Sequence, residues 1–493
     1  MSNLRTEERI DLLRDLAQMG SQGRAEGEDE GRLPKTFYPV TEHLRMLDPD
    51  VVLVVGPRGS GKTEIFRILT DAGLQQSISG LAEGVRLPPA TGTEWLKGFP
   101  LGRDGFDAGG LRRFLGQEQE QGSGAMQGLW FAYLVRRVRD HLRGEATGLE
   151  PLLDAPGGAA SQVYDAWQAA GDEPLLALDR LDQRLEREGR YLFIAYDDLD
   201  TLGGEDWEAM ATGVRGLVAF WAAYARRWRR IRPKIFLRTD LFDRFAVSGG
   251  ADLAKLAAGR VELIWSDRQL YAMLLRRIAN TSERLADYAH SPKSSIDWRE
   301  DSVLGLVPKL TRWTDAQPII ERMIGPYMGA SNKKGLSYRW PLAHIRDGRG
   351  RAVPRPLVRL FEEAARIEAD TPQAVAGMRL LHPTSLRKAI DRVSSEHVGH
   401  ARNEWGWIDG VKQRLAGLQV PVERREVESH FAMEGTWSAS ASGSKPPFQD
   451  PREFLDYVVE VGILRQRPDG RIDAADLFLY GLGLRRKGGV RRR

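Results

Sequence analysis

Short segments rich in apolar residues recur along the first 290 residues of this chain and predict buried strands. They stand at residues 51–55, 191–196, 233–242 and 261–265. Runs of this kind are typical of strands buried on both faces of a parallel sheet. Apolar residues at helical spacing lie between or beyond them, over residues 126–142, 211–230 and 267–289. This alternation predicts an α/β fold with a three-layer core, in which helices cover both faces of a parallel sheet.

The C-terminal part of the chain has a different pattern, in which helices precede a hairpin. Helical spacing is found over residues 348–367, 383–398, 407–418 and 424–433. Residues 451–484 then predict a helix, a short strand, a Pro-Asp-Gly turn and a second strand. Helices that end in such a hairpin predict a winged-helix-like domain. In proteins that read DNA, the wing and one helix contact the nucleic acid, but a fold alone does not decide a function.

The first apolar run leads directly into the most informative motif. Eight residues match G-x-x-x-x-G-K-[ST], the P-loop pattern: Gly56, Pro57, Arg58, Gly59, Ser60, Gly61, Lys62 and Thr63. The glycines let successive backbone N–H groups point inward, and with the start of the following helix these donors suit a pyrophosphate. Lys62 is expected to reach the β- and γ-phosphates, and the Thr63 hydroxyl to ligate Mg²⁺. The motif therefore predicts nucleotide binding.

The second apolar run supplies the acidic partner that a Mg-nucleotide site needs. In "RYLFIAYDDLDTL", residues 190–202, the strand ends at Asp197 and Asp198. Ligands of parallel α/β sheets lie at the carboxyl ends of the strands. Asp197 is the Walker B candidate, contacting Mg²⁺ through water, and Asp198 is the candidate for polarising the attacking water. Aspartate is one methylene shorter than the glutamate of fast ATPases, so we expect slow hydrolysis. The alternative is a strand end capped by solvated acids.

The third apolar run, "PKIFLRTDLF", carries Arg238 and Thr239 at the expected end of its strand. In the additional-strand group of P-loop ATPases, a strand that follows the Walker B strand lies beside the P-loop strand. Its end then points at the γ-phosphate. Arg238 or Thr239 could therefore distinguish a triphosphate from a diphosphate, because guanidinium binds phosphate oxygens in pairs. The alternative is that Arg238 pairs with Asp240 or Asp243 in a loop.

Together, "GPRGSGKT", "IAYDDLD" and "IFLRTD" resemble the STAND and KAP-type signalling ATPases of prokaryotes, over roughly residues 36–280. The resemblance implies an ATP-controlled switch that acts with a partner effector in bacterial signalling or defence against phage. Arg238 is similar to the γ-phosphate sensor of STAND proteins. Arg355 is similar to the second-sensor arginine of related ATPases, with helix capping or an ion pair as the alternative. The sequence has neither the KAP-type pair of transmembrane helices nor the long repeat array with which STAND proteins sense their signal. The sensing of the signal would therefore belong to a partner.

Composition and missing motifs limit which cofactors and which cellular compartment are expected. The 493 residues include no cysteine, which excludes disulfides and thiolate metal sites. No stretch approaches about 18 uninterrupted apolar residues, so no membrane span is expected. The charged N-terminus lacks the apolar core of a signal peptide, and a cytoplasmic protein is the expectation. No [NT]-K-x-D element follows the last strands, which favours ATP over a guanine nucleotide.

Four regions are predicted along the chain, at residues 1–35, 36–290, 291–380 and 381–493. They are an N-terminal helical or flexible segment, the ATPase domain, a helical linker or lid, and the winged-helix-like domain with its basic tail. The ATPase domain carries an insertion at about residues 75–160. Within it, the Gly- and Pro-rich residues 87–124 predict irregular structure, of the kind that often carries partner contacts. Residues 291–301 are predicted to be a connector.

Two arginine-rich clusters, residues 225–234 and 485–493, leave a nucleic-acid-handling ATPase open as an alternative. The net charge of +4 is small, so only such local clusters could attract DNA or RNA. Their other explanation is solvated or paired surface charge. Arg276 and Arg277 are expected to be surface charge, with contact to an adjacent subunit's nucleotide in a self-oligomer as the alternative. A small-molecule kinase is a third class, since the same lysine and Mg²⁺ ligands would serve it.

Overall fold

In the computed structural model the chain forms two units, and each is described by itself. One unit is Pro39–Leu263, and the other combines Met1–Tyr38 with Ile264–Arg493. The first unit is therefore inserted into the second. The four regions predicted from composition are finer than this division and stay a prediction. The structure describes residues 4–20, 33–71, 74, 78, 85, 87–88, 92–100, 105, 108–117, 122–142, 144, 147–203, 207–248, 256–257, 259–290, 296–402, 405–435, 437 and 446–487.

A five-stranded parallel sheet forms the centre of Pro39–Leu263, which we call the sheet unit. Its strands, in the order in which they lie side by side, are β2 (Thr93–Phe99), β3 (Tyr191–Tyr196), β4 (Ile231–Arg238), β1 (Leu53–Gly56) and β5 (Val261–Glu262). Every neighbouring pair is parallel. The four strands predicted from apolar runs are confirmed. As predicted for the additional-strand group, β4 lies between β3 and the P-loop strand β1.

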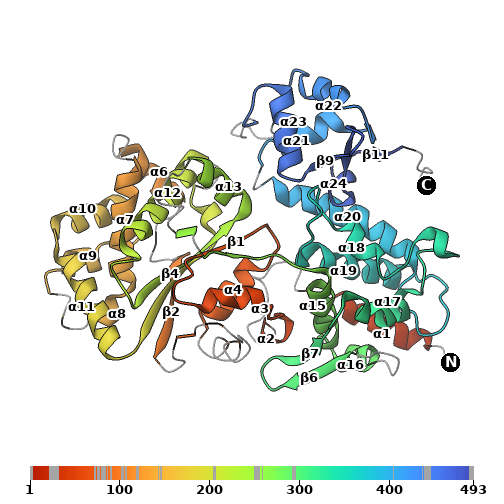
Figure 1. Ribbon diagram of the computed structural model, residues 1–493, viewed down its shortest axis with the longest axis horizontal. Coiled ribbons are helices and arrows are strands. Elements are labelled where there is room, and N and C mark those ends of the chain that lie inside the picture. The colour runs from red at the N-terminus through yellow and green to blue at the C-terminus, as the bar shows by residue number, and fades with distance from the viewer. Residues whose placement is uncertain are drawn as a thin grey trace. The chain divides into compact units, whose positions relative to one another are not determined.

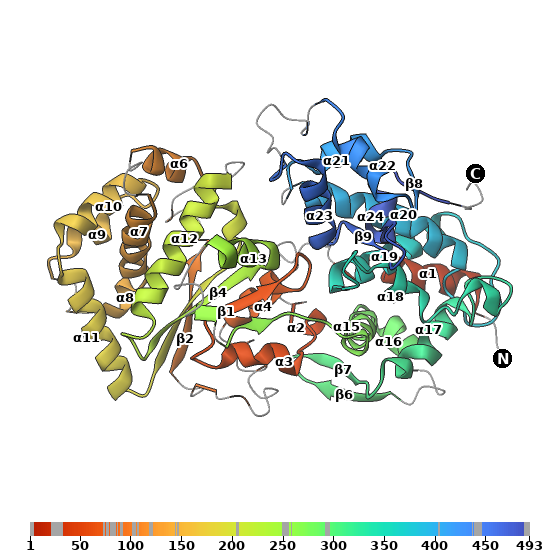
Figure 2. The same cartoon turned by 45° about the horizontal axis from the view of Figure 1, so that its top comes forward.

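Helices cover both faces of this sheet, as Figures 1 and 2 show. On one face, Phe66 of α4 (Lys62–Leu69) makes an edge-to-face contact with Phe236 of β4, with ring centroids 6.1 Å apart. On the other face, Ile235 and Leu237 join the core formed with α7 (Gly122–Arg137) and α12 (Trp207–Tyr224). Successive side chains of a strand point to opposite faces, so β4 contributes to both layers. The predicted three-layer α/β core is confirmed.

Further helices of the sheet unit are α3 (Thr41–Leu44), α6 (Ala108–Gln117), α8 (Arg139–Leu142), α9 (Glu150–Asp154), α10 (Ala160–Ala169), α11 (Glu173–Arg187) and α13 (Thr239–Ser248), with 3₁₀ turns at Arg45–Leu47 and Leu199–Thr201. The edge strand β2 lies within the segment predicted to be irregular, so that prediction is wrong for Thr93–Phe99. Trp95 of β2 stacks on Phe193 of β3, with ring centroids 4.3 Å apart. Only three of the seven β2 residues are buried. A half-buried edge strand flanked by Gly and Pro gives little apolar signal.

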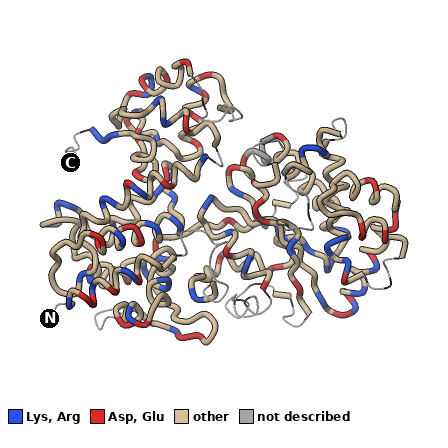
Figure 3. The backbone as a smooth tube through the Cα atoms, turned by 180° about the vertical axis from the view of Figure 1, so that it is seen from behind, with Lys and Arg blue, Asp and Glu red and all other residues tan. Residues whose placement is uncertain are grey.

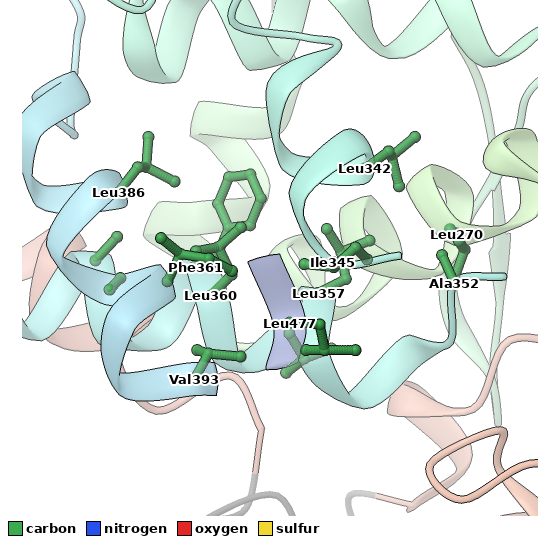
Figure 4. Close-up of a cluster of buried hydrophobic side chains, with 14 of the residues drawn as sticks. Leu270, Leu342, Ile345, Ala352, Leu357, Leu360, Phe361, Leu386, Val393 and Leu477 are labelled. Carbon is green, nitrogen blue, oxygen red and sulfur yellow. The ribbon is translucent and has the colours of Figure 1, made fainter. Parts of the chain in front are cut away.

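The second unit, which we call the helical unit, packs its helices around one core. Its helices up to residue 401 are α1 (Thr6–Leu16), α2 (Leu33–Thr36), α15 (Asp267–Ala279), α16 (Glu283–Ala289), α17 (Gln317–Ile324), α18 (Trp340–His344), α19 (Pro354–Asp370) and α20 (Pro383–Ala401), with 3₁₀ turns at Trp313–Ala316 and Asn332–Lys334. Helix α19 packs along both α20 and α1. Figure 4 shows Leu360 and Phe361 of α19 beside Leu386 and Val393 of α20. The predicted helices at 267–289, 348–367 and 383–398 are confirmed, except that the first is divided into α15 and α16 and that α19 begins only at Pro354.

Arg276 of α15 is buried inside the helical unit, so its predicted surface position is wrong. Its guanidinium donates to the backbone carbonyl oxygens of Pro34, at 2.7 Å, and Leu304, at 2.6 Å. Leu304 lies between the strands of an antiparallel hairpin, β6 (Asp297–Asp301) and β7 (Gly305–Lys309), and β6 begins inside the predicted connector. A buried arginine must find such partners. A fully buried side chain also cannot reach the nucleotide of an adjacent subunit.

Three buried glutamates on α19 form an ionic network whose carboxylate oxygens all accept hydrogen bonds. Glu368 accepts from Arg9 of α1 at 2.6 Å and from Ser385 of α20 at 2.5 Å. The other bonds are Gly20 N to Glu362 at 2.7 Å, Arg359 to Glu362 at 2.9 Å, Arg359 to Glu363 at 3.2 Å and Arg392 to Glu363 at 3.1 Å. This network, which we call the α19 network, joins the N-terminal segment to α19.

The C-terminal elements of the helical unit follow the order helix, strand, helix, helix, strand, strand. They are α21 (Ile408–Leu415), β8 (Gln419–Val420), α22 (Arg424–Phe431), α23 (Pro451–Glu460), β9 (Leu464–Gln466) and β10 (Ile472–Ala474), followed by α24 (Asp476–Leu479) and β11 (Arg485–Arg486). Strands β9 and β10 are antiparallel, and Val422 pairs with Ile472 next to β8. The predicted helices and hairpin are confirmed. Among the described helices, none combines the length and apolar character needed to cross a membrane.

Candidate nucleotide-binding site

The turn between β1 and α4 has a backbone that only glycine accommodates easily. Gly59 and Gly61 have φ angles of 77° and 99°, in the left-handed region that residues with a Cβ rarely adopt. At Gly56, an added Cβ would come within 2.5 Å of Ser60 Oγ and 3.0 Å of Leu263 Cβ. Two of the glycines are therefore required by conformation and the first one by close packing.

Lys62 is the first residue of α4, and its side chain lies over the turn that precedes it. Its Nζ donates to the carbonyl oxygen of Gly56 at 2.8 Å and to that of Pro57 at 3.0 Å. The lysine therefore places a positive charge above the backbone loop at the N-terminal end of a helix. Both the ammonium and the helix end attract phosphate.

Asp197 lies directly after β3, at the carboxyl edge of the sheet, and faces the P-loop. Asp197 is 2% exposed, and its carboxylate accepts a hydrogen bond from the Thr63 hydroxyl and lies within electrostatic reach of Lys62. Burial raises the pKa of Asp197, while Lys62 and the hydrogen bond with Thr63 act in the opposite direction. The two motifs predicted to share a site therefore meet, although they stand over 130 residues apart in the sequence.

The residues at this point fit a magnesium ion. Asp197 Oδ2 is buried and accepts no hydrogen bond. A buried carboxylate oxygen without a partner is costly unless a ligand or ion completes it. Within the described residues, no group of three or more His, Asp or Glu side chains could hold a metal by itself. Mg²⁺ in nucleotide sites is typically held by one or two protein oxygens together with phosphates and water, which matches Thr63 and Asp197.

Asp198, the candidate for polarising water, has an unusual backbone. With φ 51° and ψ 29°, it is the one non-glycine residue with positive φ among the described residues. Its carbonyl oxygen accepts from Thr201 N at 2.9 Å and from Thr201 Oγ1 at 2.8 Å, and these bonds hold the turn. Aspartate tolerates the left-handed region better than most residues, and such conformations cluster at functional sites.

Arg238 ends β4 directly beside the P-loop strand, since its register partner on β1 is Gly56. Its side chain is buried and bonds two carboxylates. Nε and Nη2 donate to Asp240 at 3.0 and 2.6 Å, and Nη1 donates to Asp200 at 3.0 Å. The pairing with Asp240 is the alternative considered from the sequence. Asp200 was not predicted as a partner from the sequence. Asp200 is the third acid of "DDLD" and therefore lies close to the same edge of the sheet as Arg238.

The other predicted site residues are less informative. Arg58 lies half-buried in the P-loop turn, and Ser60 is fully buried there. Thr239 is the first residue of α13, directly after Arg238. Arg355 lies in the first turn of α19, in the helical unit, so its contact with phosphates stays a prediction.

The arginine-rich residues 225–234 are mostly engaged in contacts within the sheet unit. Ion pairs join Arg227 to Asp179 at 2.5 Å, Arg229 to Glu186 at 3.2 Å and Arg232 to Asp50 at 2.8 Å. In the second cluster, Arg486 pairs with Asp476 at 2.8 Å, and residues 488–493 lie outside the described residues. Figure 3 shows basic and acidic positions interspersed along both units. These contacts favour the paired-charge interpretation of the clusters.

The sheet order, the P-loop after β1 and the aspartate after β3 together define the core of a P-loop NTPase. The chain is distantly similar to the Aeropyrum pernix ORC2 protein in its ADPNP–ADP complexes, with 13% identity and a TM-score of 0.35, covering 88% of this chain and 86% of the other. It is also similar to Cdc6p from Pyrobaculum aerophilum, with 12% identity and a TM-score of 0.31, covering 87% and 86%. The ADP form of the Aeropyrum pernix ORC2 protein has 12% identity and a TM-score of 0.29, covering 96% and 90%.

No protein-family model and no curated protein matches the sequence. The assignment to the P-loop NTPase fold therefore rests on the strand order and on the P-loop itself. The STAND or KAP-type subtype stays a prediction.

Proposed function

We propose that the protein binds ATP with Mg²⁺ at the P-loop, hydrolyses it slowly and uses the difference between the ATP and ADP states as a conformational switch. The observation that carries this proposal is the buried Asp197 carboxylate, which faces Lys62 and Thr63 and has an oxygen without a hydrogen-bond partner. A carboxylate in such surroundings is suited to a cation that a phosphate ligand brings with it. The cation would offset the cost of burying its charge.

Each residue of the site then has a distinct role. The Thr63 hydroxyl would hold Mg²⁺ directly, and Asp197 would hold it through water. When bound, Mg²⁺ would polarise the phosphates. Lys62 would bind the β- and γ-phosphates, and Asp198 would orient the attacking water. The short Asp198 side chain supports slow hydrolysis, which suits a switch because the ATP state must last long enough to be read by a partner. Arg238 would detect the γ-phosphate.

The C-terminal elements bear on whether the partner is a nucleic acid. Their order from α21 to β10 supports a winged-helix domain. The helix that would read DNA in such a domain is α23, and its exposed residues are Arg452, Glu453, Asp456 and Glu460. Three acids to one base disfavour contact with phosphates. In the turn between β9 and β10, Asp469 pairs with Arg467 and Arg471.

We therefore favour a protein effector over a nucleic acid as the partner of the switch. A role in bacterial signalling or defence against phage remains what the resemblance implies. Nucleic-acid-stimulated hydrolysis that is lost at high salt would instead favour the nucleic-acid-handling ATPase. Phosphate transfer to an added metabolite, in place of phosphate release, would favour a kinase.

Calorimetric titration with ATP and ADP, with and without Mg²⁺, tests the site. We expect Lys62→Ala to weaken ATP binding by about 10- to 100-fold, because hydrogen bonds to charged groups are each worth about 1.5–3 kcal/mol. Lys97→Ala is the matched control, since Lys97 is an exposed lysine of the same unit on the edge strand β2. If Lys62→Ala bound ATP as tightly as the control, the site assignment would be wrong.

A further inference from the structure

The guanidinium of Arg238 is held by carboxylates from two different segments of the sheet unit. Asp240, in the first turn of α13, accepts from both Nε and Nη2. Asp200, in the 3₁₀ turn after β3, accepts from Nη1. All three guanidinium nitrogens therefore donate to carboxylates, while the Cα of Arg238 lies opposite Gly56 of the P-loop strand.

The two carboxylates differ in the strength of their hold. Asp240 forms a two-pronged contact and is 18% exposed, whereas Asp200 forms a single contact and is 30% exposed. A paired, more buried contact is geometrically specific, while a single and more solvated one is easier to exchange. Asp200 also lies within electrostatic reach of the candidate Mg²⁺ residue Asp197, because its charge raises the pKa of Asp197.

We propose that Asp240 orients Arg238 and that Asp200 is the exchangeable partner, which a γ-phosphate replaces on Nη1. The proposal rests on the proposed nucleotide function and assigns to Asp200 and Asp240 opposite effects on the choice between ATP and ADP. A γ-phosphate carries more charge than a carboxylate and can accept from a guanidinium that is already aligned. A diphosphate lacks this group and leaves the bond to Asp200 in place.

Opposite consequences follow for two matched substitutions. In Asp200→Asn, the side chain keeps its shape and loses the charge that competes with the γ-phosphate, so preference for the triphosphate should rise. In Asp240→Asn, Arg238 loses the contact that aligns it, so the preference should fall toward that of Arg238→Ala. A merely structural role of either aspartate would change the affinities for both nucleotides alike and leave their ratio unchanged.

The experiment measures the dissociation constants of a non-hydrolysable ATP analogue and of ADP, both with Mg²⁺, on the full chain. The variants are Asp200→Asn, Asp240→Asn, Arg238→Ala and the double variant Arg238→Ala/Asp200→Asn. Glu208→Gln is the control, because it removes one exposed carboxylate near the start of α12 in the same unit. We expect Asp200→Asn to raise the preference for the triphosphate about fivefold and Asp240→Asn to lower it by a similar factor.

The double variant shows whether Asp200 acts through Arg238, since interacting residues give non-additive effects. The effect of Asp200→Asn should disappear when Arg238 is alanine. An unchanged or lowered preference in Asp200→Asn, or an increase that persists without Arg238, would overturn the inference. If Asp240→Asn failed to fold, Asp200→Asn and the double variant would still decide. A wild-type protein that binds neither nucleotide would instead refute the proposed function, so the two failures are distinguishable.

Discussion

The nucleotide site and the α19 network both bury carboxylates, but they treat them differently. In the α19 network, Glu362, Glu363 and Glu368 have hydrogen-bond partners on both oxygens. In the sheet unit, Asp197 is equally buried and leaves Oδ2 without a partner. The first arrangement is complete by itself, whereas the second needs a further group.

This difference separates structural charges from functional ones. In a buried ion pair whose carboxylate oxygens all accept hydrogen bonds, removal of one partner is costly, because the remaining charge is left uncompensated. A buried carboxylate with one oxygen that accepts no hydrogen bond is compensated only in part, so neutralising it should cost the fold little. What it should lose is the binding of an ion or ligand.

The largest expected effect is on the α19 network. Glu368→Gln should lower the free energy of unfolding by about 3–5 kcal/mol, because the largely buried guanidinium of Arg9 would lose its fully buried counter-charge. Urea unfolding, with hydrogen exchange of the α1 amides, measures this. Glu396→Gln is the control, since Glu396 pairs with Arg359 but is 40% exposed, and should cost at most about 1 kcal/mol. Equal losses in both variants would remove the distinction between the buried and the solvated pair.

The second effect is on the nucleotide site, where we expect a loss of binding and not of stability. Asp197→Asn should leave the free energy of unfolding nearly unchanged, because the burial that raises the pKa of Asp197 already disfavours its charge. The gain in ATP affinity on adding Mg²⁺ should fall by about 10- to 100-fold, or about 1.4–2.8 kcal/mol. Calorimetry with and without Mg²⁺ measures it. A strong loss of stability with unchanged Mg²⁺ dependence would place Asp197 among the structural charges.

The smallest effect concerns a third kind of buried charge. Lys234 of β4 is fully buried and has two backbone carbonyls, of Asp48 and Val51, as partners. Burial lowers the pKa of Lys234 well below its usual value of 10.5. The folded state therefore binds a proton less readily than the unfolded chain, and stability should rise with pH between the lowered pKa and about 10.5.

Lys234→Met should change the free energy of unfolding by no more than about 1 kcal/mol, since a similar apolar volume often replaces a buried charge without loss. It should also abolish the rise in stability with pH, which unfolding at a series of pH values detects. The same pH dependence in the variant would show that other groups cause it.

The sequence could predict those parts of the fold whose signal is local. The P-loop, the strand before Asp197 and the strand ending at Arg238 are each recognisable from adjacent residues. The place of the last of these beside the P-loop strand was also predicted, as in the additional-strand group. Strand β2 escaped prediction because only three of its seven residues are buried, so its apolar signal is weak. The contacts of Arg276 and Asp200 could not be predicted, because their partners lie far from them along the chain. Arg276 bonds Pro34 and Leu304, and Asp200 bonds Arg238.

The insertion of the sheet unit into the helical unit determines which pieces of the protein can be studied alone. The sheet unit, residues 39–263, is one continuous stretch and could be expressed as a single polypeptide. The helical unit is discontinuous, and its first segment supplies Arg9 to Glu368. Deleting the N-terminal residues to isolate an ATPase would therefore remove a partner of α19, which lies more than 300 residues further along the chain. The intact helical unit could be obtained by joining residues 38 and 264 through a short linker, or by supplying residues 1–38 as a separate peptide.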